Sequence, residues 1–172
     1  MQRVAIFGTA GSGKSWLAER LACGTGLRVV ELDALYWGHD WQPAPLDLFR
    51  HRVECEIKDG SWIVVGIYGQ VRDLTWPAAD TLVWLDLPLP LVMWRLLRRT
   101  VRRAITKENL WGTGNRESLR TALFSRDSIL LYALKTHRRN RRPGIRDARN
   151  RSNGRMHIRL ARQRCQMTIQ RR

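Results

Sequence analysis

The sequence predicts an α/β fold of three layers, in which a parallel β-sheet is covered by helices on both faces. Three observations carry this prediction. Short, wholly apolar runs recur along the first half of the chain, which is typical of strands buried on both faces. Segments of helical period separate these runs, and such alternation favours parallel pairing of the strands. A glycine-rich loop, GTAGSGKS at residues 8–15, joins the first apolar run to the first helical segment.

Four strands and two helices are expected within the first 90 residues. The expected strands are residues 2–7, 27–32, 62–65 and 81–85, and the expected helices are residues 14–22 and 46–58. In the second helix Phe49, Val53 and Ile57 follow one another at four-residue steps, as one buried helix face requires. The third and fourth strands are separated by a segment containing Trp76 and Pro77, which we expect to be a loop.

A basic amphipathic helix is expected from Leu89 to Ile105. Its arginines recur at i, i+3, i+4 and i+7, so one face is expected to carry Arg95, Arg98, Arg99 and Arg102. Residues 107–117 contain two glycines and are expected to form a mobile loop, after which a helical period returns over residues 118–135. We therefore expect one domain at residues 1–137, with a lid at about residues 103–118.

The formal charge of +16 is concentrated in the second half of the chain. Residues 1–90 carry 8 Lys and Arg against 11 Asp and Glu, whereas residues 91–172 carry 23 against 4. The second half therefore favours anionic partners such as nucleotides, nucleic acid or an anionic membrane surface. Residues 138–172 hold 13 arginines and one acid. We see no strand there and expect a basic C-terminal tail that is partly disordered, or an aberrant end produced by a shifted reading frame.

Length and cysteine usage exclude several other classes of protein. With 172 residues the chain is the size of one domain, and no apolar run is long enough to span a membrane. The apolar N-terminal run leads into a glycine loop, which favours a buried strand over a signal peptide. Three widely spaced cysteines without a CxxC pair argue against a disulfide scaffold or a zinc site and fit a reducing cytoplasm.

The glycine-rich loop matches the pattern G-x-x-x-x-G-K-[ST] of phosphate-binding loops (P-loops). Its glycines let backbone N–H groups turn inward around phosphate oxygens, and the following helix points its positive dipole end at the same place. Lys14 is expected to reach the β- and γ-phosphates, and the Ser15 hydroxyl to be a ligand of Mg²⁺. ATP and Mg²⁺ are therefore the expected cofactors, held by Gly8, Thr9, Ala10, Gly11, Ser12, Gly13, Lys14 and Ser15.

Several segments behind the loop follow one another as they do in a known family. They include ELDALYW at residues 31–37, WPAADTLVWLDLP at 76–88, NRESLR at 115–120 and SRDSIL at 125–130. With the loop, these segments make the chain resemble the bacterial topology modulation proteins, small P-loop proteins similar to adenylate kinases. The resemblance covers about residues 1–140. It implies an adenylate-kinase-like P-loop NTPase fold and the chemistry of a small-molecule or nucleotide kinase.

The resemblance also implies roles for residues outside the loop. Asp33, just after the second strand, would face the phosphoryl acceptor and orient its hydroxyl or accept its proton, although it could equally cap a loop. Arg72 would bind a phosphate or carboxylate of the acceptor, or be an ordinary surface arginine. Arginines near the lid would stabilise charge on the transferred group. The catalytic candidates are Lys14, Asp33, Arg98 and Arg102, and Arg116 is a candidate substrate contact alongside Asp33 and Arg72.

One strand departs from the family's pattern. The family reads W-[IV]-[IV]-D-G-N-Y at the third strand, where this chain has WIVVGIY, so Val65 and Ile67 replace polar residues. The missing acid matters because it lies near Mg²⁺ through water, and a valine offers no oxygen. Three explanations stay open: Asp33 or Asp86 supplies the carboxylate, catalysis is weakened while ATP binding survives, or the two changes are lesions in a decaying copy.

Two functions follow from these features. The first is an ATP-dependent phosphotransferase that acts on a nucleotide or on another, unidentified small-molecule acceptor. The alternative is a catalytically weak ATP-binding regulator whose arginine-rich end makes non-specific, salt-sensitive contact with nucleic acid. Membrane-surface association ranks lower, because the apolar face of the arginine helix is needed to cover the sheet.

Overall fold

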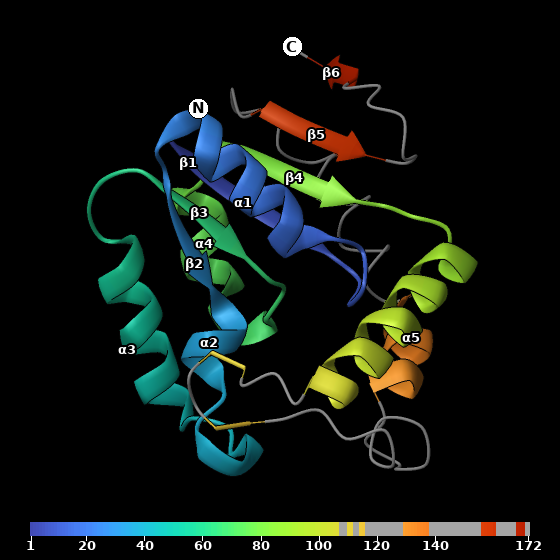
Figure 1. Ribbon diagram of the computed structural model, residues 1–172. Coiled ribbons are helices and arrows are strands. Elements are labelled where there is room, and N and C mark those ends of the chain that lie inside the picture. The colour runs from blue at the N-terminus through green and yellow to red at the C-terminus, as the bar shows by residue number, and fades with distance from the viewer. Residues whose placement is uncertain (107–109, 112–113, 116–128, 138–155, 161–167, 171–172) are drawn as a thin grey trace.

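The computed structural model describes residues 1–106, 110–111, 114–115, 129–137, 156–160 and 168–170. These residues form a six-stranded sheet in the order β2-β3-β1-β4-β5-β6 (Figure 1). The strands are β1 (Arg3–Gly8), β2 (Arg28–Glu31), β3 (Trp62–Val65), β4 (Thr81–Leu85), β5 (Met156–Leu160) and β6 (Thr168–Gln170). Their order places β1, which leads into the phosphate loop, between β3 and β4.

The parallel sheet expected from the sequence is confirmed for β1 to β4. β1 pairs in parallel with β3 and β4, and β2 pairs in parallel with β3. Every residue of β3 and β4 is buried, which explains why apolar runs in the sequence mark the bounds of both strands. Parallel pairing gathers the carboxyl ends of these strands at one edge of the sheet, where ligands bind in open α/β folds.

The prediction of a tail without strands is wrong. β5 pairs in parallel with β4, and β6 pairs antiparallel with β5, so the complete sheet is mixed rather than wholly parallel. The sequence of β5, MHIRL, alternates apolar and polar residues, a strand signal that the surrounding arginines concealed. The rest of the expected tail lies outside the described residues, and its disorder stays a prediction.

Helices cover both faces of the sheet, as the three-layer fold class predicts. On one face α1 (Lys14–Thr25) buries Ala18 against the strands. On the other face α3 (Leu46–Ile57) buries three apolar side chains, and α4 (Arg72–Ala78) buries Trp76. Figure 1 shows α1 crossing in front of the strands and α4 on their far side.

The segment around Pro77 that was expected to be a loop is instead helix α4. Trp76 is buried with its ring 4.8 Å from the ring of Phe7, and this contact anchors the helical turn to β1. Pro77 has no N–H to donate to the preceding turn, and α4 ends one residue later. The proline therefore shortens the helix without preventing it.

The basic amphipathic helix is confirmed as α5 (Leu89–Thr106). Residues 129–137 are also helical and overlap the span of residues 118–135 where a helical period was expected to return. Most of the predicted lid lies outside the described residues, although Leu110 and Asn115 form an isolated β-bridge. In the part of the chain that the structure describes, no helix is long and apolar enough to cross a membrane.

Candidate functional site

The phosphate loop lies at the carboxyl end of β1 and packs closely against its neighbours. A side chain on Gly8 would meet the carbonyl oxygen of Leu85 in β4 at 2.8 Å. One on Gly11 would meet the carbonyl oxygen of Val92 in α5 at 2.9 Å, and Gly11 has a positive φ of 81°. Glycine is therefore required at both positions for the loop to fit between β4 and α5.

Ser12 provides the test of whether this loop fits a phosphate. Its side chain is 3% exposed, and its Oγ finds no hydrogen-bond partner among the described residues. A buried hydroxyl without a partner costs about 1–3 kcal/mol, and a phosphate oxygen would accept its hydrogen bond. α1 begins at Lys14, so the unpaired amide groups of its first turn face the same space. The loop therefore fits an anionic phosphate group.

Lys14 lies over the loop. Its Nζ donates to the carbonyl oxygen of Gly8 at 3.1 Å and to that of Thr9 at 3.2 Å. Burial lowers the pKa of Lys14 below its ordinary value; two nearby carboxylates oppose this effect, and the Arg99 charge adds to it. The ammonium group is thus held against the backbone of the loop.

Glu31 is a site residue that the sequence analysis missed. It is the last residue of β2 and pairs in register with Val65 of β3, so both side chains point to the same face of the sheet. Burial raises the pKa of the Glu31 carboxyl; a hydrogen bond with the Ser15 side chain lowers it, and the Asp33 charge raises it. A carboxylate therefore lies beside the predicted magnesium ligand at the level of Val65. Only the strand register reveals this, because an acid at a strand end is not distinctive by itself.

Asp33 lies in the first turn of α2 (Leu32–Tyr36), directly after β2. The Tyr68 hydroxyl donates to its Oδ1 at 2.6 Å. Burial raises the pKa of Tyr68 above its ordinary range, and the Asp33 charge acts in the same direction, so the phenol stays protonated and keeps donating. This bond fixes the carboxylate and uses one of its two oxygens. Among the described residues the other oxygen accepts no hydrogen bond.

The arginines of α5 divide into two sets. Val92, Leu96 and Thr100 are buried, so the helix turns this face toward the rest of the protein. Arg95 Nη1 lies 3.7 Å from where a side chain on Gly13 would begin, and the Arg99 charge acts on Lys14. The two predicted catalytic arginines, Arg98 and Arg102, are exposed instead. The structure therefore brings Arg95 and Arg99 to the loop, and the catalytic role of the exposed pair stays a prediction.

Three further candidates, Arg72, Asp86 and Arg116, have different positions, and one of them is undescribed. Arg72 is exposed, with its guanidinium 5.1 Å from the ring centre of Trp76, so its contact with an acceptor stays a prediction. Asp86 is buried directly after β4. Arg116 lies outside the described residues.

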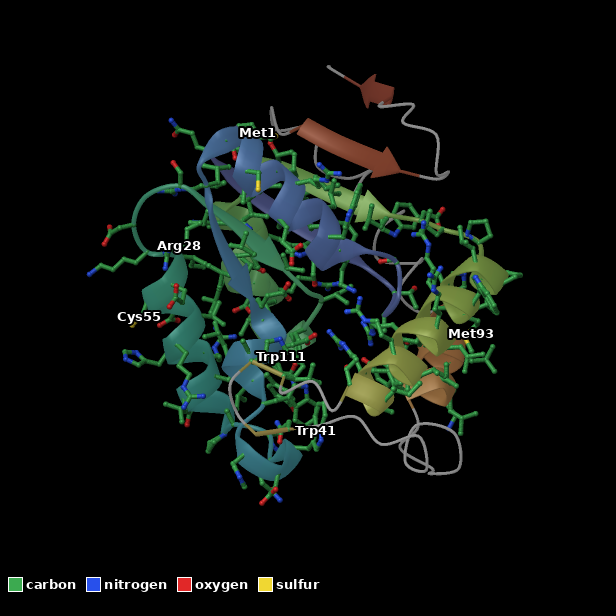
Figure 2. All side chains as sticks on the ribbon, in the orientation of Figure 1. Met1, Arg28, Trp41, Cys55, Met93 and Trp111 are labelled. Carbon is green, nitrogen blue, oxygen red and sulfur yellow. The ribbon has the colours of Figure 1, made fainter. Side chains whose placement is uncertain are left out.

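Trp111 and Asn115, from the region of the predicted lid, contact the segment that follows α2. Asn115 Nδ2 donates to the carbonyl oxygen of Gly38 at 2.8 Å, and Asn115 Oδ1 accepts from the Trp41 N–H at 3.0 Å. The rings of Trp41 and Trp111 meet edge to face with centres 6.0 Å apart (Figure 2). We call these four residues the lid contact.

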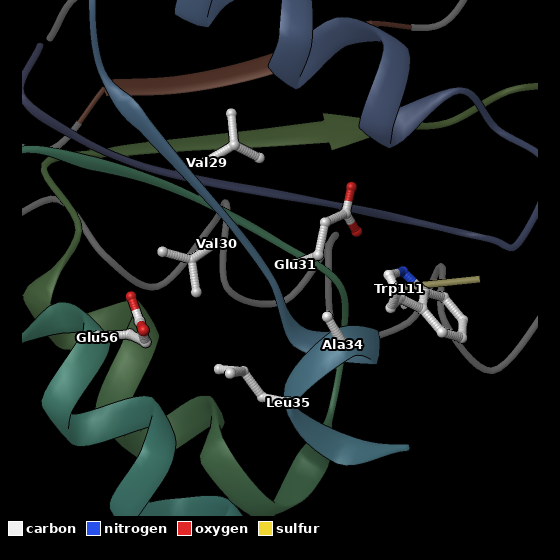
Figure 3. Close-up of a pocket in the computed structure, with 7 residues that line it drawn as sticks. All are labelled: Val29, Val30, Glu31, Ala34, Leu35, Glu56 and Trp111. Carbon is white, nitrogen blue, oxygen red and sulfur yellow. The ribbon is translucent and has the colours of Figure 1, made fainter. Parts of the chain in front are cut away.

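A cavity of about 300 Å³ lies along β2, the outer strand of the sheet (Figure 3). Figure 3 shows Glu31 and Trp111 on one side of it and Glu56 on the other. Arg28 pairs with Glu56. The remaining lining is apolar and comes from Val29, Val30, Ala34 and Leu35. The cavity therefore joins the candidate site to the lid contact through Glu31 and Trp111.

No family model and no curated protein matches the sequence. A solved gluconokinase from Sinorhizobium meliloti 1021 has a similar fold, with a TM-score of 0.52 and 18% identity over 93% of this chain and 82% of that chain. The fold is that of small P-loop kinases. A shikimate kinase from Bacteroides thetaiotaomicron is similar over 83% of this chain and 79% of that chain, with 14% identity and a TM-score of 0.49.

The P-loop kinase fold confirms the adenylate-kinase-like architecture expected from the sequence. In this fold, the sheet order 2-3-1-4 sets the carboxyl ends of β2 and β3 beside the phosphate loop. At 18% identity the likeness shows the fold alone. The chemistry must therefore be argued from Lys14, Ser15, Glu31 and Asp33.

Proposed function

We propose that the chain is an ATP-dependent small-molecule kinase that transfers the γ-phosphoryl group to a hydroxyl of its acceptor. The observation that carries the proposal is a cluster of mutually interacting side chains at the end of β2, namely Lys14, Ser15, Glu31 and Asp33. An ammonium group, a hydroxyl and carboxylates are the groups that phosphoryl transfer from a magnesium nucleotide uses. The similarity in fold to a gluconokinase supports a small acceptor.

Ser15 and Glu31 are the residues that would hold Mg²⁺, through a hydroxyl and a carboxylate. When bound, Mg²⁺ neutralises phosphate charge. Because Mg²⁺ is commonly held by one or two carboxylates together with the nucleotide phosphates, it needs no larger set of protein ligands. The described residues contain no group of three or more His, Cys, Asp and Glu that could hold a metal ion. Glu31 would supply the carboxylate that Val65 cannot, which favours retained catalysis.

Lys14 and Asp33 would act on opposite partners. The Lys14 ammonium would bind the oxygens of the transferred group in place of the carbonyl oxygens of Gly8 and Thr9. Asp33 would orient the acceptor hydroxyl and accept its proton. The Tyr68 hydroxyl, bound to Asp33 Oδ1, would hold the carboxylate in the orientation that this task requires.

The proposal is tested by incubating purified protein with ATP, Mg²⁺ and a panel of sugars, sugar acids, cyclic polyols and nucleosides. ADP and new phosphate esters are measured by mass spectrometry. We expect one acceptor class to be phosphorylated by the wild type, and the rate to fall at least about 100-fold in Lys14→Ala and Asp33→Asn. A phosphate ester formed equally fast by Asp33→Asn would refute the role of this carboxylate, and no ester with any acceptor would refute the kinase assignment.

A second candidate function, ATP-binding regulation with nucleic-acid contact, is favoured by the outer face of α5. Arg98 and Arg102 are exposed there, and Trp94, which is 63% exposed, precedes Arg98 by about one helical turn and Arg102 by about two. Arginines beside an exposed aromatic ring suit a phosphate backbone and a stacked base. We expect affinity for a fluorescent single-stranded oligonucleotide to fall steeply with salt, and to fall further in an Arg98→Ala, Arg102→Ala variant. Affinity that is independent of both changes would rule this candidate out.

We also propose that the chain belongs to the topology modulation proteins and acts in the cytoplasm. The segments ELDALYW and WPAADTLVWLDLP support the family. Cys23 and Cys55 are exposed free thiols, which suit a reducing compartment. Fractionation of cells that express the full chain tests the location, and recovery in the membrane fraction would contradict it.

A further inference from the structure

The phosphate loop is tied to a distant part of the chain through Thr9. The Thr9 Oγ1 and His137 Nδ1 lie 3.2 Å apart, although the two residues are 128 positions apart in the sequence. Thr9 is 5% exposed and His137 is 6% exposed, so the hydrogen bond is shielded from water. His137 is the last described residue of the helix at residues 129–137, drawn in orange in Figure 1.

Thr9 is also the residue on which the shape of the loop depends. Its carbonyl oxygen accepts from Lys14 Nζ at 3.2 Å and from the Ser12 N–H at 3.1 Å. A shift of Thr9 would therefore move the lysine ammonium and also the turn that carries the unpartnered Ser12 hydroxyl. The hydrogen bond to His137 therefore holds the side chain of the residue that both groups contact.

We propose that His137 is a positioning residue of the ATP phosphate site, acting through its Nδ1 bond to Thr9. The inference rests on the proposed function, since it assigns a support to the loop that would bind ATP. Its consequence is that the helix at residues 129–137 and the phosphate loop move as one unit. A histidine that only filled space in the core would be replaceable by an apolar side chain, whereas a positioning histidine must keep a hydrogen-bonding atom at Nδ1.

Two substitutions of His137 separate these roles. In His137→Asn the amide group lies where Nδ1 was, whereas in His137→Leu no hydrogen bond is possible. We expect calorimetric titration to show that the leucine variant binds ATP–Mg²⁺ about three- to tenfold more weakly, while the asparagine variant stays within about twofold of the wild type. Equal affinity of the wild type and the leucine variant, or equal losses in the two variants, would overturn the proposal.

Two substitutions of Thr9, the partner of His137 in the hydrogen bond, provide a matched test. Thr9→Val removes the hydroxyl while keeping the shape of the side chain, and Thr9→Ser keeps the hydroxyl. We expect the valine variant to lose as much affinity as His137→Leu, and the double variant to lose no more than either single change, because both remove one interaction. Additive losses would overturn the proposal. If His137→Leu does not fold, the Thr9 pair and His137→Asn still decide the question.

These experiments distinguish a failure of the His137 proposal from a failure of the proposed kinase function. A wild-type protein that binds no ATP would refute the kinase assignment and this inference with it. ATP binding that depends on Lys14 but not on the bond between Thr9 and His137 would refute this inference alone. Thermal unfolding without nucleotide, measured on each variant, shows whether a loss of affinity is a loss of folded protein.

Discussion

At residue 65 the sequence conflicts with the chemistry of a kinase, because Val65 is buried and carries no oxygen. Glu31 lies opposite it on the neighbouring strand and interacts with Ser15 and Lys14. In the kinase proposed above, Glu31 would supply the carboxylate that position 65 lacks. This placement has a cost, since burial disfavours the charged form of Glu31.

Glu31→Gln should stabilise the fold without nucleotide, and more so at higher pH. Below its ordinary pKa, Glu31 is protonated in both the folded and the unfolded chain and its burial costs no charge. As the pH rises through the raised pKa of the folded state, stability is lost because the folded chain must bury a carboxylate. Thermal unfolding at about pH 5 and about pH 8 should show that the glutamine variant gains mainly at the higher pH. An equal gain at both values would contradict the raised pKa.

Tyr68→Phe should destabilise the fold by about 1–3 kcal/mol, because it removes the hydrogen bond to the half-buried Asp33 carboxylate. Tyr36→Phe is the matched control, since the two rings pack together and the Tyr36 hydroxyl makes no hydrogen bond within the described residues. Chemical denaturation measures both variants. Similar losses in the two would show that the bond to Asp33 adds nothing beyond the loss of a tyrosine hydroxyl.

Among the helices, α5 has one face that packs on the phosphate loop and another that is exposed. Its buried face packs on the phosphate loop, where Gly11 leaves room for Val92 and Leu96. Arg95 and Arg99 flank this face and are partly buried, whereas Arg98 and Arg102 are exposed. The four arginines, which the sequence places on one helix face, are therefore divided into two pairs because α5 packs against the loop with its buried face.

Alanine substitutions on the two sides of α5 should have different effects on ATP affinity. We expect Arg95→Ala and Arg99→Ala to weaken binding by about tenfold each, because each removes a charge beside the phosphates. Arg98→Ala and Arg102→Ala are matched controls on the same helix and should change it by less than about twofold. Calorimetry with ATP–Mg²⁺ measures all four variants. A larger loss from the exposed pair would contradict this division of the helix.

The lid contact should be sensitive to Asn115. Its buried amide group bonds to the backbone of Gly38, directly before η1 (His39–Trp41), and of Trp41, the last residue of η1. Asn115→Ala would leave two backbone groups without these partners, at a cost of about 1–3 kcal/mol for each that stays buried. Hydrogen exchange at the Trp41 amide should therefore become at least about tenfold faster. Unchanged exchange would show that the contact does not hold this segment closed.

For the whole molecule, the sequence predicted the features that depend on a local pattern of residues. β3 and β4 are wholly buried and appear as uninterrupted apolar runs, so their bounds match the sequence prediction. The phosphate loop was predicted because its glycines, Lys14 and Ser15 are consecutive in the chain.

The features that could not be predicted depend on tertiary structure. The role of Glu31 follows from its register with Val65, which no local signal contains. The tie between Thr9 and His137 spans 128 positions. α4 forms despite Pro77 because Trp76 is buried against Phe7. β5 was missed because its alternation is short and arginine-rich, so only pairing with β4 makes it recognisable.

The most direct measurement is a calorimetric titration of the protein with ATP, with and without Mg²⁺, for the wild type, Lys14→Ala and Glu31→Gln. The loop predicts that the wild type binds ATP–Mg²⁺ and that Lys14→Ala weakens this binding by at least about tenfold. If Glu31 supplies the carboxylate near Mg²⁺ that Val65 cannot, Mg²⁺ should strengthen ATP binding in the wild type and have much less effect in Glu31→Gln. Binding that is absent, or that is the same in all three proteins, would contradict the account.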